Sequence, residues 1–259
     1  MSQPDSLCIL IGSERPAQSR ATAANLWYCH AQAEHLSHQS RRHMSYRAIE
    51  KAAQKAGLLT MGAAHVQNLT GAASDPATVV LLGTGAAFWP IFSASREGQD
   101  GMPHPVDRWS KRIVGTLADQ FDAATAYPSD GPPYPPFISW ALKTNRFFLS
   151  PVGMMVHDTV GLMISIRGAL LFDTELVIPS ADLASPCTAC AAPCTTACPV
   201  GALSAEASYD VTACHGYLDT PEGQSCMSQG CHARRACPFS AGASRTDAQS
   251  ALHMKAFHP

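Results

Sequence analysis

The organisation of this chain is decided by one stretch, Cys187-Thr188-Ala189-Cys190-Ala191-Ala192-Pro193-Cys194-Thr195-Thr196-Ala197-Cys198-Pro199. It holds four of the ten cysteines in a chain of 259 residues. Four more cysteines follow it closely, at Cys214, Cys226, Cys231 and Cys237. Only Cys8 and Cys29 lie outside this region. So dense an array indicates metal binding or a disulfide framework, and we expect the function to depend on it.

The spacing of the array favours iron–sulfur clusters. The first run reads C-x2-C-x3-C-x3-C-P, one residue longer than the C-x2-C-x2-C-x3-C-P run of bacterial two-cluster ferredoxins. The second run reads C-x4-C-x5-C-P, so both runs end in Cys-Pro, at Cys198-Pro199 and Cys237-Pro238. Thiolates are soft ligands that suit iron, and small residues between them let backbone amides face the sulfurs. We therefore predict two [4Fe-4S] clusters.

In ferredoxins the cysteine that ends a run binds the other cluster, and this crossover predicts the ligand sets. The first set is Cys187, Cys190, Cys194 and Cys237. The second set is Cys198, Cys214, Cys226 and Cys231. Two alternatives remain open: two zinc sites of four cysteines each, and disulfides, which an oxidising compartment would require. We interpret Cys8 and Cys29 as free thiols with no part in the sites.

The chain before the array predicts a sheet with helices. Ser45 is a suitable N-cap for a helix that begins at Tyr46, and Gly57 suits its C-terminal end. Apolar residues at helical spacing predict a helix over 105–121, and a proline-rich loop at 130–136 precedes a short helix over 137–143. Strands are expected at 58–66, at 78–82 before a tight turn at Gly83-Thr84-Gly85, over 160–172 and at 176–178.

These patterns predict an α+β protein: an α/β sheet domain flanked by helices, followed by a small cysteine-rich domain of the two-cluster ferredoxin kind. The expected domains are 44–180, which is a possible cofactor-binding domain, and 181–259, which holds the clusters. Residues 1–43 show no sustained periodicity, and we interpret them as a disordered leader or a spurious extension.

Composition narrows the function classes further. The chain is 46% hydrophobic and 15% charged, against about 25% charged residues in an average soluble domain. A net charge of −2 gives no direct indication of nucleic-acid binding. The sequence has no apolar run of membrane-spanning length and no secretory signal, so a cytoplasmic protein is expected.

From His104 to its end the chain resembles epoxyqueuosine reductase and its relatives. That family joins a cobalamin-binding, nitroreductase-like domain to a ferredoxin domain with two [4Fe-4S] clusters. The resemblance implies cobalamin as a further cofactor and tRNA as a partner. It is carried by four segments: Val106-Asp107-Arg108-Trp109-Ser110-Lys111-Arg112, Gly153-Met154-Met155-Val156-His157-Asp158-Thr159, Arg167-Gly168-Ala169-Leu170-Leu171-Phe172 and Cys198-Pro199-Val200-Gly201-Ala202-Leu203.

Two further site residues are suggested beside the cysteines. The resemblance implies that Asp130, in Asp130-Gly131-Pro132-Pro133, is the counterpart of the family's proton donor in a D-x-x-P loop; ordinary turn chemistry is the alternative. Val156 and His157 stand where the family has glycine and lysine. Imidazole binds cobalt and iron and titrates near neutrality, so His157 is a candidate corrinoid ligand or proton donor, or else a structural histidine.

Three functions are therefore compared. The first is an electron-transfer protein with two [4Fe-4S] clusters that exchanges electrons with a redox partner protein. The second is a cobalamin- or flavin-dependent reductase whose clusters supply electrons to that cofactor. The third is a zinc-stabilised interaction protein. In the first two, Arg234 and Arg235 would face a cluster or the redox partner, or form a solvated pair in their loop.

Overall fold

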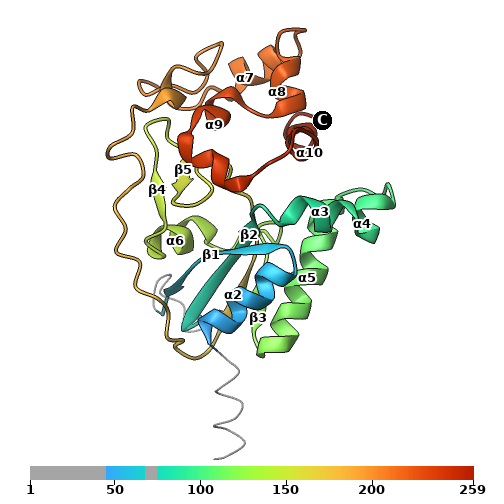
Figure 1. Ribbon diagram of the computed structural model, residues 1–259, viewed down its shortest axis with the longest axis vertical. Helices are drawn as coiled ribbons and strands as arrows, with labels where there is room; N and C mark the ends of the chain where they lie inside the picture. The colour runs from blue at the N-terminus through green and yellow to red at the C-terminus, as the bar shows by residue number, and fades with distance from the viewer. Residues whose placement is uncertain (1–44, 68–74) are drawn as a thin grey trace, which may run out of the picture. The chain divides into compact units, whose positions relative to one another are not determined.

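The computed structural model describes residues 45–67 and 75–259 (Figure 1). The described residues are a mixture of helix and sheet, as expected for an α+β protein. The predicted leader at 1–43, with Cys8 and Cys29, lies outside the described residues. No helix in the described ranges is long and apolar enough to cross a membrane.

The first helix begins and ends where its sequence predicts. Helix α2 spans Tyr46–Lys55, and the Ser45 side chain accepts a hydrogen bond from the Ala48 amide at 3.2 Å. Gly57 follows with a φ of +88°, a conformation that glycine adopts without strain. The chain then turns into strand β1, Leu58–His65.

A four-stranded antiparallel sheet forms the centre of the N-terminal part. Strands β2 (Thr78–Thr84), β3 (Ala124–Ala126) and β6 (Ile166–Phe172) join β1 in the order β1-β2-β6-β3. Every residue of β2 is buried, in keeping with its continuous apolar sequence. The predicted turn at 83–85 begins too early, because β2 continues to Thr84 and Gly83 pairs with Ile166 of β6.

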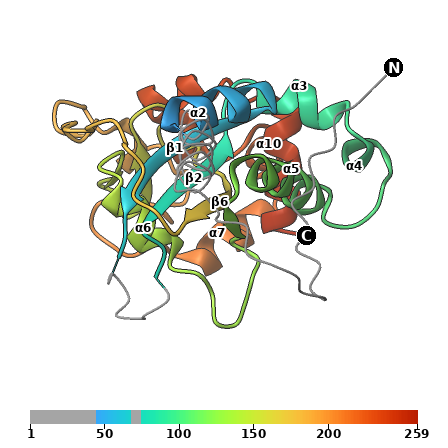
Figure 2. The ribbon, with the colours of Figure 1, turned by 90° about the horizontal axis from the view of Figure 1, so that it is seen from below.

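Both faces of the sheet are covered, and alternate residues of β2 point to opposite sides. On one side Val80 and Leu82 pack against helix α2 and the long helix α5, Pro105–Phe121. On the other side Val79 and Leu81 pack against helix α6, Phe137–Lys143. Figure 2 shows α2 and α6 on opposite sides of the strands. The predicted helices 105–121 and 137–143 are both confirmed.

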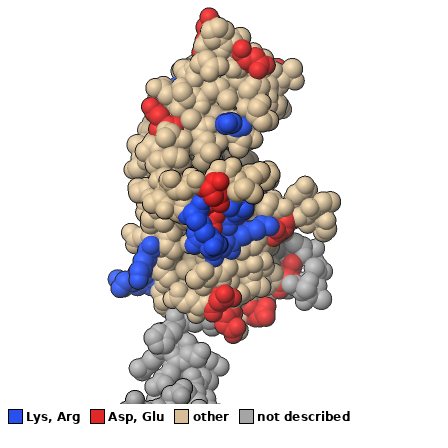
Figure 3. Space-filling model, turned by 90° about the vertical axis from the view of Figure 1, so that its right-hand side faces the viewer, with Lys and Arg blue, Asp and Glu red and all other residues tan. Residues whose placement is uncertain are grey.

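Two short helices precede α5, and the second supplies a buried acid that pairs with an arginine of α5. They are α3, Phe88–Ser93, and α4, Arg96–Gln99. Glu97 of α4 is 3% exposed and receives hydrogen bonds from Arg112 at 2.6 and 2.7 Å. These bonds hold the pKa of Glu97 far below its ordinary value. Figure 3 shows basic and acidic side chains adjacent on this face, with few charges over the cysteine-containing part above.

The predicted strands after α6 are shorter than the apolar sequence suggests. Strands β4 (Phe147–Leu149) and β5 (Met155–His157) form a separate antiparallel pair. Residues 160–165 are not a strand; only 166–172 is, and 176–178 also lies outside any strand. Leu162 is nevertheless 1% exposed, because the cysteine-containing part covers this loop.

The cysteine-containing part consists of short helices joined by loops. The chain reaches it from β6 through a long extended segment (Figure 1). A third cluster of buried residues connects it to the β4–β5 pair and includes Val156, Leu162, Cys194 and Cys237. Its helices are η1 (Pro193–Thr195), α7 (Val211–Leu218), α8 (Gln224–Gln229), α9 (His232–Ala236), η2 (Pro238–Ala243) and α10 (Asp247–Phe257).

Candidate functional site

Eight cysteines line two separate cavities in this part of the chain. The first is an open cavity of about 300 Å³, and its other walls are mainly proline and apolar side chains, including Val156 and Leu162. Its cysteines are Cys187, Cys190, Cys194 and Cys237.

The second cavity has about 370 Å³ of empty space and is lined mostly by Pro199, Leu203, Leu218 and other apolar side chains. Tyr209 also lines it. Its cysteines are Cys198, Cys214, Cys226 and Cys231. Each cavity thus has four sulfur donors in a mostly apolar wall, and the two sets coincide with the sets that the ferredoxin crossover predicts.

Helix α9 accounts for the crossing of the chain between the cavities. Cys231 is its N-cap and Cys237 its C-cap, so a helix of 5 residues separates the two cysteines. Cys231 lines the second cavity and Cys237 the first. In the first run a similar change occurs after η1, which begins at Pro193 and contains Cys194. Cys194 lines the first cavity, and Cys198 lines the second.

All eight cysteines of the described residues are free thiols. Burial raises the pKa of Cys187, Cys194, Cys214 and Cys226, so these groups are protonated near neutrality in the protein alone. Metal binding requires the thiolate and therefore releases protons. Within the described ranges, no group of three or more His, Cys, Asp or Glu side chains is placed to hold a single metal ion.

The backbone around the first set fits a sulfur-ligated cofactor. The Ala192 amide donates a hydrogen bond to Sγ of Cys190 at 3.4 Å. Ala192 has a φ of +51°, in the left-handed region. Amide donors of this kind lower the negative charge on ligating sulfurs. The first set thus has four thiol ligands, a mostly apolar wall and a backbone amide that donates to a cysteine sulfur, and these are the groups that hold a [4Fe-4S] cluster.

His157 lies away from both cavities and uses both ring nitrogens inside the fold. Its Nε2 lies 2.9 Å from the Met61 carbonyl oxygen, which requires the proton on Nε2. Its Nδ1 accepts a hydrogen bond from the Thr159 amide at 3.1 Å. The ring is 0% exposed, and burial lowers the pKa of His157 to about 4. These contacts give His157 a structural role and leave no ring nitrogen for a corrinoid.

Asp130 stabilises its own loop in the structure. Its carboxylate accepts a hydrogen bond from the Tyr127 amide at 2.9 Å and lies 3.5 Å from the Lys111 ammonium. Its side chain is 40% exposed, and it lines neither cysteine cavity. The contacts are those of turn chemistry, and the predicted proton-donor role remains a prediction without structural support.

A third and larger cavity, with about 800 Å³ of empty space, adjoins the second cysteine set. Cys214 and Cys231 belong to its wall, together with Tyr209, Arg245 and His253. Sequence reasoning missed these last three residues, because single Tyr, Arg and His residues outside a motif carry no spacing signal. Of the arginine pair on α9, Arg234 lines this cavity, whereas Arg235 is exposed.

Comparison with known proteins gives no relative from which a function is transferred. No protein-family model matches the chain, and no curated protein sequence is significantly similar to it.

Proposed function

We propose that this chain is an iron–sulfur electron-transfer protein that holds two [4Fe-4S] clusters in a ferredoxin-like C-terminal part. The observation that carries the proposal is the division of the eight cysteines into two cavities of four, with Cys237 in the first set and Cys198 in the second. Two independent zinc knuckles would not need ligands exchanged between the runs, whereas the ferredoxin arrangement requires it.

In this function the protein's own residues hold the clusters and limit their contact with water. The buried side chains of Leu203 and Leu218 cover the second set, and Val156 and Leu162 cover the first. When bound, a [4Fe-4S] cluster supplies one-electron redox chemistry. Apolar surroundings and amide donors are the means by which the chain would set its potential.

Each cysteine cavity also lies close to the surface, as exchange with a redox partner protein requires. Val200 lines the second cavity and is 43% exposed, and Phe239 lines the first and is 39% exposed. A partner that contacts either side chain would be separated from the cluster by that side chain alone. These two residues are therefore the proposed points of approach for an electron donor or acceptor.

Anaerobic reconstitution with iron and sulfide tests the proposal. We expect a brown protein with about eight iron and about eight sulfide per chain, since each cubane has four of each. On reduction with dithionite it should give the electron paramagnetic resonance (EPR) signals of two neighbouring clusters. A colourless protein that excludes iron and binds about two zinc ions would reject electron transfer and favour the zinc-stabilised interaction protein.

A second candidate function is a reductase in which the clusters supply electrons to cobalamin or a flavin. The large cavity beside the second cysteine set favours it, because a bound cofactor there would adjoin Cys214 and Cys231. Titration of the iron-loaded protein with cobalamin and with flavin mononucleotide, followed by absorbance, tests this function. Binding of either one supports the reductase, and binding of neither leaves the electron carrier. A tRNA substrate, which the resemblance to epoxyqueuosine reductase implies, would be expected only if cobalamin or flavin mononucleotide binds.

A further inference from the structure

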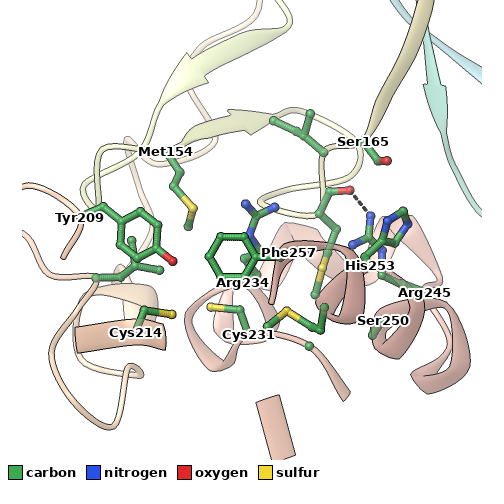
Figure 4. A pocket seen from close by; sticks show the side chains of 15 residues that line it. Met154, Ser165, Tyr209, Cys214, Cys231, Arg234, Arg245, Ser250, His253 and Phe257 are labelled. Carbon is green, nitrogen blue, oxygen red and sulfur yellow. Dashed lines mark hydrogen bonds between the residues drawn. The ribbon is translucent and has the colours of Figure 1, made fainter. Parts of the chain in front are cut away.

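The large cavity beside the second cysteine set combines an apolar wall with cationic groups. Figure 4 shows Arg245 and His253 at one end, Cys214 and Cys231 with their sulfur atoms toward one another, and Arg234 between, above Cys231. The cationic groups are Arg234 and Arg245. Most of the remaining wall is apolar: Met154, Met163, Ile164, Leu203, Met254 and Phe257.

Neither arginine of the wall is paired with an acid. The Arg234 guanidinium donates to the Leu162 carbonyl at 3.1 Å, and the Arg245 guanidinium donates to the Met163 carbonyl at 2.9 Å. Among the ion pairs of the described residues, none includes Arg234 or Arg245. Carbonyl oxygens orient the two guanidinium groups but do not neutralise their charge.

Two buried nitrogen atoms of this wall also lack a hydrogen-bond partner: Nε of Arg245 and Nε2 of His253. Buried polar atoms are rarely left without a partner, because the loss of hydration is not compensated. Burial lowers the pKa of Arg245 to about 10 and that of His253 to about 3. The site is therefore deficient in acceptors and in negative charge.

A ligand that supplies an acidic group would correct both deficiencies. Carboxylate, sulfonate and phosphate groups accept several charge-assisted hydrogen bonds, and a planar guanidinium pairs with them at two oxygens. The methionine and phenylalanine side chains require a different chemistry, an apolar body that is removed from water. The two requirements together define an organic acid with an apolar body.

We propose that this cavity binds a small organic acid. Its acidic group is held by Arg234 and Arg245, and its apolar body rests on the wall beside Cys214 and Cys231. The proposal rests on the proposed function, because these two cysteines are also ligands of the second cluster. The bound acid would lie next to that cluster. The cavity therefore suits a redox-active ligand or an effector.

Anaerobic titration calorimetry of the iron-loaded protein tests the proposal with 8-anilinonaphthalene-1-sulfonate as the probe. Its neutral analogue, N-phenyl-1-naphthylamine, has the same apolar body without the acid. We expect Arg245→Gln and Arg234→Met to weaken sulfonate binding roughly ten- to one-hundredfold, as the loss of a charge-assisted hydrogen bond does. Binding of the neutral analogue should not change, and Arg245→Lys should lose less sulfonate affinity than Arg245→Gln, because lysine keeps the charge but cannot pair with two oxygens.

The matched control is Arg235→Met, which removes the same charge from the next position of α9 but outside the cavity. It should leave the sulfonate affinity unchanged. Equal affinity in all variants, or no binding to the wild type, would overturn the proposal. Each sample is also analysed for iron. About eight iron with unaltered sulfonate binding rejects only the organic-acid site, whereas absence of iron rejects the proposed function.

Discussion

The crossed arrangement of the cysteines predicts how iron content responds to two closely matched variants. Both replace Cys187, Cys190 and Cys194 by alanine, and they differ only in the fourth substitution, Cys237→Ala or Cys198→Ala. The Cys237 variant removes every sulfur of the first cavity and leaves the second complete. It should retain one cluster, about four iron per chain.

The Cys198 variant removes the whole first run instead. It leaves Cys214, Cys226 and Cys231 at the second cavity and only Cys237 at the first, so no complete set of four remains. We expect less than about four iron, and that iron should be removed by a chelator.

Iron analysis before and after a chelator wash, with EPR of the reduced protein, measures the difference. Near-ultraviolet circular dichroism of the buried Trp109 and Trp140 checks that the sheet is intact in both variants. If the Cys198 variant holds about four chelator-resistant iron and the Cys237 variant holds none, each run binds its own cluster, and the crossed sets are wrong.

The remaining predictions concern the free energy of unfolding, measured by urea denaturation at neutral pH except where another pH is given. Gly242→Ala should destabilise the fold by about 1 to 3 kcal/mol, because the new Cβ overlaps the Thr159 carbonyl; Gly216→Ala in α7 has open space and should stabilise by up to about 1 kcal/mol. Equal effects would refute this contrast. Glu97→Gln should lower the free energy of unfolding by about 2 kcal/mol, a value between the contributions of exposed and of buried ion pairs. Since the pKa of Glu97 is lowered in the fold, that difference is complete above pH 4.5 and must shrink in more acidic solution; a constant difference would contradict the ion pair. His157→Phe should cost about 2 to 4 kcal/mol and leave iron content unchanged, because it removes two buried hydrogen bonds. Between pH 6.5 and about 4 the unfolded state binds more protons than the folded state, so the wild type should lose more stability than the variant as the pH falls through this window. Parallel curves of stability against pH would contradict this prediction.

Local sequence signals predicted the helices α2, α5 and α6, whereas α3, α4 and the short helices of the cysteine-containing part were not predicted. The bounds of α5 and α6 follow from apolar periodicity and from prolines that exclude helix before them. The strand order did not follow, because strands pair through contacts between distant residues. Strand β6 lies between β2 and β3, and no local pattern specifies these neighbours.

The predicted strand at 160–165 was wrong for a related reason. Its apolar residues are buried, but by the cysteine-containing part and not within the sheet. Gly161 has a φ of +56° and lies against Ser240, whose hydroxyl accepts a hydrogen bond from the Leu162 amide at 3.2 Å. A hydrophobic run shows that a segment is buried and does not show which partner buries it.

The candidate site was only partly accessible to sequence reasoning. The spacing of the cysteines and the repeated Cys-Pro predicted their division between the cavities, through the crossover found in two-cluster ferredoxins. The arginine and histidine residues of the large cavity could not be predicted. Arg245 and His253 come from the C-terminal segment, Arg234 from α9, and only the packing of α10 near the loop after β5 brings them together.

Loading of the two proposed sites is coupled through the chain itself. The loop that Cys194 and Cys237 close contains the whole segment from Cys198 to Cys231, so the two cysteine pairs are nested. A cluster bound at the inner pair shortens the free chain that the outer pair must close, and a shorter loop loses less entropy on closure. Assembly should therefore be cooperative, so that chains with a single cluster are rare when iron supply is intermediate. A chain that has lost both clusters should bind the first one more weakly than the second.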